Sequence, residues 1–217
     1  MTSTAPAADR PHAWRPGASG PPLLLLHGTG DNEHGLLPLG EDLAPGAPLL
    51  SPRGTVLEGT MPRFFRRLRE GVFDEADLRE RADELAEFIR TAGGSYGLEP
   101  GSLVAVGFSN GANMAAAMLL LHPELLAGAV LIAAMPPLAE PPAADITGRR
   151  VLVSSGLQDP LAPPEQARSL VGQLSERGAD VQLLTHDGGH LVEPTHLPAM
   201  RAFLRPSGLE LQAHHSD

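Results

Sequence analysis

The chain lacks cysteine and lysine altogether. None of its 217 residues is a cysteine, and all 16 basic residues are arginines. Without cysteine the protein has no thiol nucleophile, no disulfide, and no cysteine-ligated zinc or iron–sulfur site. Without lysine it has no Schiff-base residue, no covalently held pyridoxal phosphate and no Walker lysine. For an enzyme that uses a covalent intermediate, serine is therefore the leading candidate nucleophile.

A net positive charge and long apolar segments are also missing. The formal net charge is -10, which argues against a nucleic-acid groove because such a groove needs clustered basic residues. The first 20 residues lack the apolar core of a secretory signal, and the longest later apolar stretch stops at Pro136 and Pro137, short of membrane-spanning length. We expect a cytoplasmic protein with no nucleic-acid partner and no stable membrane insertion.

The alternation of short apolar runs with helix-like segments predicts the fold. Length and composition indicate one domain, and we expect a loose N-terminal segment at 1–20, an α/β domain at 21–206 and a tail at 207–217. The expected strands are 23–26, 49–50, 103–106, 129–133, 151–154 and 181–184, with 12–15 as a candidate edge strand. The expected helices are 77–90, 112–121, 165–177 and 194–204. This order predicts a mainly parallel sheet with helices on both faces and ligands bound at the carboxyl ends of its strands.

Ser109 has the sequence context of a nucleophile elbow. It is the centre of Gly-Phe-Ser-Asn-Gly at 107–111, between an apolar run and an apolar helix-like run. A serine on such a turn has a strained backbone that directs its hydroxyl into the cleft, and Gly107 and Gly111 let strand and helix pass closely. The alternative is a structural turn with an idle serine.

A catalytic serine needs a base and an orienting carboxylate at the same sheet edge. Asp159 follows the strand expected at 151–154, and His190 follows the one expected at 181–184. The order serine, aspartate, histidine is that of α/β-hydrolases. His190 is preferred over the rival bases because two glycines free its loop to reach back over the sheet. The rival bases are His186 and His196, and the fallback carboxylates are Asp145, Asp180 and Asp187.

The tetrahedral intermediate of acyl transfer needs two backbone N–H donors. We expect one from Asn110, the residue after the nucleophile, and one from Thr29 in the loop His-Gly-Thr-Gly at 27–30. His27 ends a buried strand, and we interpret it as a structural hydrogen-bonding group rather than a base.

The segment at 61–75 has two open interpretations. Its aromatic residues either line a substrate pocket or pack in the core. Its arginines either attract an anionic substrate or form the solvated face of a short helix, paired with acids near Glu70 and Asp74. The candidate pocket residues are Phe64, Phe65, Phe73 and Leu161, and the arginines are Arg63, Arg66, Arg67 and Arg69.

Taken together, these motifs resemble the phospholipase/carboxylesterase family of α/β-hydrolases, and within it the small bacterial MhqD-like carboxylesterases. The resemblance spans about 23–204. Its motifs are Leu-Leu-His-Gly-Thr-Gly at 25–30, Gly-Phe-Ser-Asn-Gly-Ala-Asn at 107–113, Gly-Leu-Gln-Asp-Pro at 156–160 and Gly-Gly-His at 188–190, with further signatures at 51–54, 61–67 and 71–75.

The resemblance implies a cofactor-free serine esterase without a large cap domain. It further implies short-chain monocarboxylic ester substrates, hydrolysis through an acyl-enzyme, and homodimers as a common assembly. Its catalytic residues carry over to Ser109, Asp159 and His190, in agreement with the placement argued above. The chain departs from the family in the polar loop at 30–34, where Glu33 either orders the oxyanion loop or contacts substrate.

Several rival functions follow from the same residues. A thioesterase or a lysophospholipase of the same family would share the whole catalytic apparatus, and a non-catalytic small-molecule binding protein could use the same scaffold. A dienelactone-hydrolase-type enzyme normally uses a cysteine nucleophile, so a serine at position 109 argues against it. A metal site at His186 and His190 would need a helix where Asp-Gly-Gly predicts a loop. A dinucleotide motif at 28–33 lacks its third glycine, because position 33 is a glutamate.

Overall fold

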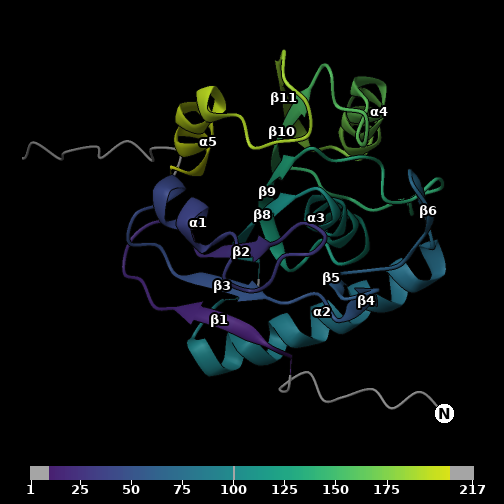
Figure 1. Ribbon diagram of the computed structural model, residues 1–217. Helices are drawn as coiled ribbons and strands as arrows, with labels where there is room; N and C mark the ends of the chain where they lie inside the picture. The colour runs from purple at the N-terminus through teal and green to yellow at the C-terminus, as the bar shows by residue number, and fades with distance from the viewer. Residues whose placement is uncertain (1–9, 100, 206–217) are drawn as a thin grey trace, which may run out of the picture.

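The protein has one seven-stranded sheet in the computed structural model, which describes residues 10–99 and 101–205. The strand order is β1-β3-β2-β8-β9-β10-β11, and β1 alone in this sheet runs antiparallel to its neighbour (Figure 1). The strands are β1 (His12–Arg15), β2 (Leu23–Leu26), β3 (Leu49–Pro52), β8 (Leu103–Phe108), β9 (Leu126–Ile132), β10 (Arg150–Gly156) and β11 (Asp180–His186). The predicted mainly parallel sheet is confirmed, and the candidate edge strand is β1.

Helices cover both faces of this sheet, as predicted. One layer holds α1 (Leu37–Leu43) and α5 (Leu197–Leu204), and the other holds α2 (Glu75–Tyr96), α3 (Asn110–Leu121) and α4 (Pro164–Ser175) (Figure 1). A short 3-10 turn, η2 (Pro194–His196), leads into α5. Each helix layer closes a separate hydrophobic core against the sheet. The central strands are apolar throughout because both of their faces are covered.

Helix α3 is the most deeply buried helix and begins directly after β8. All of its residues from Asn110 to Leu120 are buried, because α3 lies between the sheet and α2. This burial on every side explains why its sequence is apolar all round rather than amphipathic. By contrast α2 buries one stripe only, and its N-cap residue is Asp74, whose carboxylate accepts a hydrogen bond from the Asp77 N–H.

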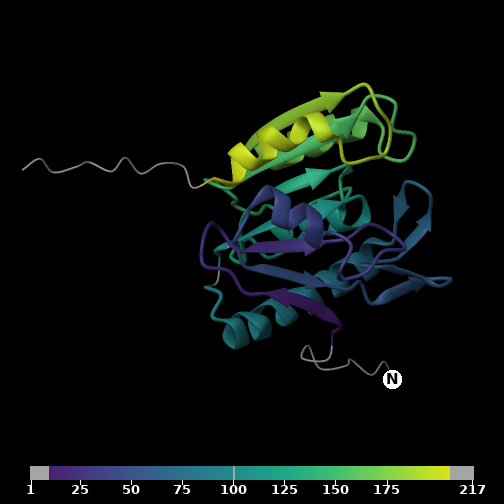
Figure 2. The same ribbon diagram turned by 60° about the vertical axis from the view of Figure 1, so that its left-hand side comes forward.

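Two small hairpins lie at the edge of the sheet to which the parallel strands point (Figure 2). They are β4 (Val56–Glu58) with β5 (Met61–Arg63) and β6 (Arg67–Arg69) with β7 (Val72–Phe73). The short helix considered for the arginines at 63–69 is therefore wrong. Gly59 and Gly71 turn the chain with φ of 63° and 69°, a conformation that favours glycine and closes hairpins instead of continuing a helix.

The strands expected at 12–15 and 23–26 have the observed bounds, and the other expected elements were found with shifted ends. Helix α1 and the four hairpin strands were not expected. The predicted domain bounds at 21 and 206 stay predictions. The expected tail at 207–217 and the first nine residues of the expected loose segment lie outside the described residues. Within 10–99 and 101–205, no helix combines the length and apolarity needed to cross a bilayer.

We expect Gly111→Ala to destabilise the fold by about 3 kcal/mol, because overpacking at a rigid site is penalised to this extent. A Cβ at position 111 would lie 2.0 Å from the Leu26 carbonyl oxygen. The matched control is Gly94→Ala on α2, where a Cβ meets nothing within 4 Å, and we expect it to stabilise by about 0.5–1 kcal/mol through helix propensity. Urea unfolding measures the change in the free energy of unfolding for both variants. Wild-type stability in Gly111→Ala would contradict the packing argument.

Candidate active site

Ser109 lies on a sharp turn between β8 and α3. Its backbone has φ 53° and ψ -117°, which is strained for a residue with a side chain. Its N–H donates to the Ile132 carbonyl at 2.9 Å. A Cβ at Gly107 would lie 2.6 Å from the Ala112 Cα, and one at Gly111 would meet the β2 backbone. Both glycines are therefore steric requirements of this turn, as the motif predicts.

The structure brings Ser109, His190 and Asp159 into one hydrogen-bonded chain. The His190 Nε2 lies 2.8 Å from the Ser109 Oγ, and the His190 Nδ1 lies 2.7 Å from the Asp159 Oδ2. An ionised carboxylate can only accept, so Nδ1 carries the proton and Nε2 is the acceptor for the serine hydroxyl. This tautomer is the one in which an imidazole can take a proton from serine.

The Asp159 carboxylate is held by its own loop. Its side chain is fully buried, and its Oδ1 accepts hydrogen bonds from the N–H groups of Leu161 at 2.8 Å and Ala162 at 2.9 Å. The other oxygen is left for His190. Two backbone bonds thus fix the rotation of the carboxylate and the direction in which it faces the imidazole.

Backbone contacts between two loops bring Asp159 to His190. The Leu157 N–H donates to the His186 carbonyl at 2.8 Å, and the Gln158 N–H donates to the Gly188 carbonyl at 3.0 Å. A Cβ at Gly156 would lie 2.4 Å from the Gly189 carbonyl oxygen. The loops after β10 and β11 therefore pack backbone against backbone, which only glycine at position 156 allows.

The rival histidines support the loop instead of reaching Ser109. The buried His186 accepts a hydrogen bond from the Gly188 N–H at 3.2 Å and lies 3.6 Å from the Glu193 carboxylate. The buried His196 hydrogen-bonds the Ser154 hydroxyl at 2.8 Å. Neither member of this second serine–histidine pair lines the pocket that contains Ser109.

The two expected oxyanion donors both lie at the pocket. Thr29 and Asn110 are among its lining residues, and neither backbone N–H donates to another group in the described part of the chain. Both N–H groups are therefore unengaged beside the serine. This is the arrangement that a developing oxyanion requires.

His27 holds the loop that carries Thr29. The ring is fully buried; its Nδ1 donates to the Gly28 carbonyl at 2.6 Å, and its Nε2 accepts from the Gly54 N–H at 3.0 Å. Burial lowers the pKa of His27 below its ordinary value, because the charged form is disfavoured away from water. The prediction that His27 is structural is confirmed.

Glu33 orders the polar loop beyond Thr29. Its carboxylate forms a two-point ion pair with the Arg53 guanidinium, with Arg53 Nη2 at 2.7 Å from Oε1 and Nε on Oε2. This hydrogen bonding lowers the pKa of Glu33. Glu33 does not line the pocket, so of the two roles considered for it the structure favours the ordering of the loop.

A pocket of about 380 Å³ opens above Ser109. Of the four candidate pocket residues, Phe73 and Leu161 line it, and Phe64 and Phe65 do not. The two latter rings are fully buried core residues: Phe64 packs on His27 at 4.8 Å, and Phe65 packs edge-on against Phe73 at 5.1 Å. The segment between the two hairpins buries both rings in the core, so their assignment to the pocket is corrected.

Two asparagine side chains at the start of α3 were not predicted to have a role. The Asn110 Oδ1 accepts from the Phe64 N–H at 2.7 Å, and the Asn113 Oδ1 accepts from the Met135 N–H at 2.8 Å. Each asparagine thus ties a pocket wall to the helix. Two amides in an otherwise apolar, buried helix were the available signal, because buried polar groups are kept only where they are hydrogen-bonded.

No group of three or more histidine, aspartate or glutamate side chains within residues 10–99 and 101–205 is arranged to hold a metal ion. The described site contributes a serine hydroxyl, an imidazole and a carboxylate. These groups, with two free backbone donors, are those used in nucleophilic acyl transfer.

Comparison with known proteins points to the same chemistry. The profile of the phospholipase/carboxylesterase family matches residues 18–207. Over 179 residues the chain is 46% identical to the hydrolase MhqD of Bacillus subtilis (strain 168), covering 82% of this chain and 90% of that protein. The Bacillus cereus carboxylesterase structure matches with 40% identity and a TM-score of 0.88, over 91% of this chain and 94% of that one. The Mesorhizobium loti carboxylesterase structure matches with 32% identity and a TM-score of 0.82, over 87% and 90%.

His27 gives a prediction for stability against pH. Its folded pKa is lowered, so the unfolded state binds more protons once the pH falls below about 6.5, and the free energy of unfolding decreases from there toward lower pH. In His27→Gln a side-chain oxygen can still accept from the Gly54 N–H but does not titrate. We expect urea midpoints at pH 7.5 and 5.5 to differ less in His27→Gln than in the wild type; equal differences would refute a neutral His27.

Proposed function

Because the chain belongs to the phospholipase/carboxylesterase family of α/β-hydrolases, we propose that it is a serine carboxylesterase with Ser109, His190 and Asp159 as its catalytic triad. The family resemblance predicted from the sequence motifs is confirmed by this membership. The observation that carries the proposal is the hydrogen-bonded chain from the Ser109 hydroxyl through the imidazole to a buried carboxylate.

In the proposed reaction the Ser109 Oγ attacks the ester carbonyl as His190 Nε2 takes its proton. Asp159 stabilises the imidazolium through Nδ1–H, and the N–H groups of Thr29 and Asn110 stabilise the oxyanion. The protonated His190 then gives its proton to the leaving alcohol, so that an acyl-enzyme remains on Ser109. Water, deprotonated by the same imidazole, hydrolyses that intermediate and regenerates the serine.

The size of the pocket supports short-chain substrates. Its volume of about 380 Å³ lies near the lower end of the ~300–1,000 Å³ typical of ligand sites. Asn110 and Asn113 hold two of its walls by backbone hydrogen bonds, so enlargement would break buried bonds. We propose short monocarboxylic esters as the substrate class. The cytoplasmic location, the homodimer and the lack of a cofactor stay predictions from the sequence.

We expect Ser109→Ala and His190→Ala each to reduce kcat for p-nitrophenyl butyrate by roughly 10⁴-fold or more, since triad members act as a unit. The matched controls are His186→Ala and His196→Ala, which remove buried histidines outside the pocket. Steady-state kinetics on folded protein, checked by circular dichroism, measure this. Substantial activity in His190→Ala, or labelling of Ser109→Ala by a fluorophosphonate, would reject the assignment. A wild type that neither reacts with the probe nor hydrolyses the ester would instead be a binding protein.

A substrate panel tests the chain-length preference. We expect kcat/KM for p-nitrophenyl esters to be highest at acyl lengths of about two to four carbons and to fall for longer chains that exceed the pocket. A short acyl thioester and a lysophospholipid belong in the same panel. Higher kcat/KM for either of them than for every short ester would replace carboxylesterase by thioesterase or lysophospholipase.

A further inference from the structure

The pocket wall formed by the hairpins carries two arginines. Arg63 and Arg67 line it together with one acid, Glu70, although the chain as a whole has a net charge of -10. We propose that the substrate ester bears a second, ionised carboxylate, which Arg63 and Arg67 bind. This inference rests on the proposed esterase function and narrows its substrate class.

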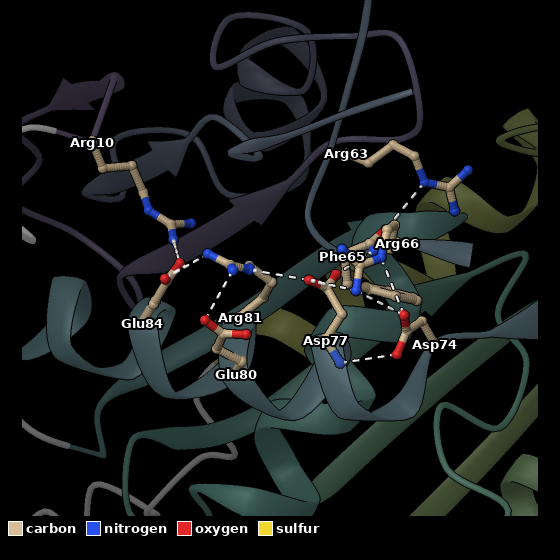
Figure 3. Close-up of polar contacts among 9 residues, drawn as sticks. All are labelled: Arg10, Arg63, Phe65, Arg66, Asp74, Asp77, Glu80, Arg81 and Glu84. Carbon is tan, nitrogen blue, oxygen red and sulfur yellow. Dashed lines mark hydrogen bonds and ion pairs between the residues drawn. The ribbon is translucent and has the colours of Figure 1, made fainter. Parts of the chain in front are cut away.

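Arg63 is buried but incompletely paired. Its side chain is 4% exposed, its Nε donates to the Phe65 carbonyl at 3.2 Å, and its Nη1 donates to the Glu58 Oε2 at 2.6 Å. Its Nη2 has no partner among the described residues. Figure 3 shows the end of this guanidinium directed away from the ion pairs along α2. Burial lowers the pKa of Arg63, so a second carboxylate would relieve a cation that has lost much of its water.

Arg67 shares the same carboxylate. Its Nε and Nη2 both donate to the Glu58 Oε1, at 3.1 Å and 2.8 Å. Its Nη1 lies 3.5 Å from the Glu70 Oε2, but the Glu70 side chain is 59% exposed, and water screens such a contact strongly. One carboxylate, Glu58, therefore serves two guanidinium groups at the pocket wall. Each arginine keeps an Nη donor that Glu58 does not engage, and the exposed Glu70 is the other acid beside the pair.

The neighbouring arginine Arg66 shows the contrast. Two carboxylates at the start of α2 lie near its guanidinium, Asp74 at 2.8 Å and Asp77 at 3.7 Å, and the ion pairs continue along the helix to Arg81 (Figure 3). Arg66 does not line the pocket. Arg66, outside the pocket, thus has two acids beside it, whereas the two arginines at the pocket share Glu58 and have only the exposed Glu70 besides it. Guanidinium donors that can bind an anion therefore lie where a substrate would bind.

A third donor at the same pocket has no partner either. Asn110 is among the residues that line the pocket, and its side-chain Nδ2 is buried without a hydrogen-bond partner among the described residues. Its Oδ1 is fixed as the oxygen because it accepts from the Phe64 N–H. Unpaired buried donors are rare. The pocket therefore offers unused donors to a ligand rich in acceptor oxygens, which a carboxylate is.

The test compares pairs of esters that differ in one carboxylate. For the acyl side, mono-p-nitrophenyl glutarate is compared with p-nitrophenyl pentanoate; for the alcohol side, 4-acetoxybenzoate is compared with 4-acetoxybenzamide. The measured quantity is the ratio of kcat/KM for the anionic ester to that for its neutral partner. We expect a ratio of roughly ten in at least one pair, because charge-assisted hydrogen bonds would favour the anionic ester.

Arg67→Gln removes one guanidinium and leaves Glu58 paired with Arg63, so the hairpin keeps an ion pair. We expect it to lower the ratio of the favoured pair by roughly tenfold, and Arg67→Lys to restore part of it. The control is Arg69→Gln, which lies on the same strand outside the pocket and should keep the wild-type ratio.

Ratios at or below one in both pairs, or an unchanged ratio in Arg67→Gln, overturn the carboxylate proposal. In either case the esterase proposal would stand if the wild type hydrolyses the neutral esters and Ser109→Ala does not. Failure of every ester together with absent fluorophosphonate labelling would remove both proposals.

Discussion

The close passage of α3 against the ends of β2 and β8 is the constraint on which the site depends. No side chain fits at Gly107 or Gly111, so the chain reverses within two residues and Ser109 takes a strained backbone conformation with positive φ. The same passage places Asn110 and Asn113 next to the loops that follow β5 and β9, where each accepts one backbone hydrogen bond. One packing contact therefore fixes the positions of the nucleophile, of one expected oxyanion donor and of two pocket walls.

The burial of α3 stabilises that strained turn. A non-glycine residue in a sparsely populated conformation costs about 1–3 kcal/mol. Met114, Met118 and Leu119 are fully buried in the same helix, and full burial of each such side chain contributes about 1.5–3 kcal/mol. Three side chains thus outweigh the strain of one residue, so the fold can hold Ser109 in this conformation without a bound ligand.

Sequence reasoning succeeded where one periodicity governs a whole element. Continuous apolar runs identified the buried parallel strands, and position after a strand brought Asp159 and His190 to the same edge as Ser109. It failed at the hairpins, where strands of two or three residues are too short for a periodic signal and turns at Gly59 and Gly71 decide the structure. The pairing of Glu58 with Arg67 joins separate hairpins, so no local pattern could show it.

The central claim is that Ser109 becomes acylated, and mass spectrometry of the trapped intermediate tests it most directly. The enzyme is mixed with p-nitrophenyl butyrate, quenched in acid within the first turnovers, digested and mapped. The mechanism predicts a butyryl adduct on the peptide that contains Ser109, absent in Ser109→Ala and accumulating when deacylation is slowed. Turnover without any adduct on that peptide, or an adduct on another residue that persists in Ser109→Ala, would contradict it.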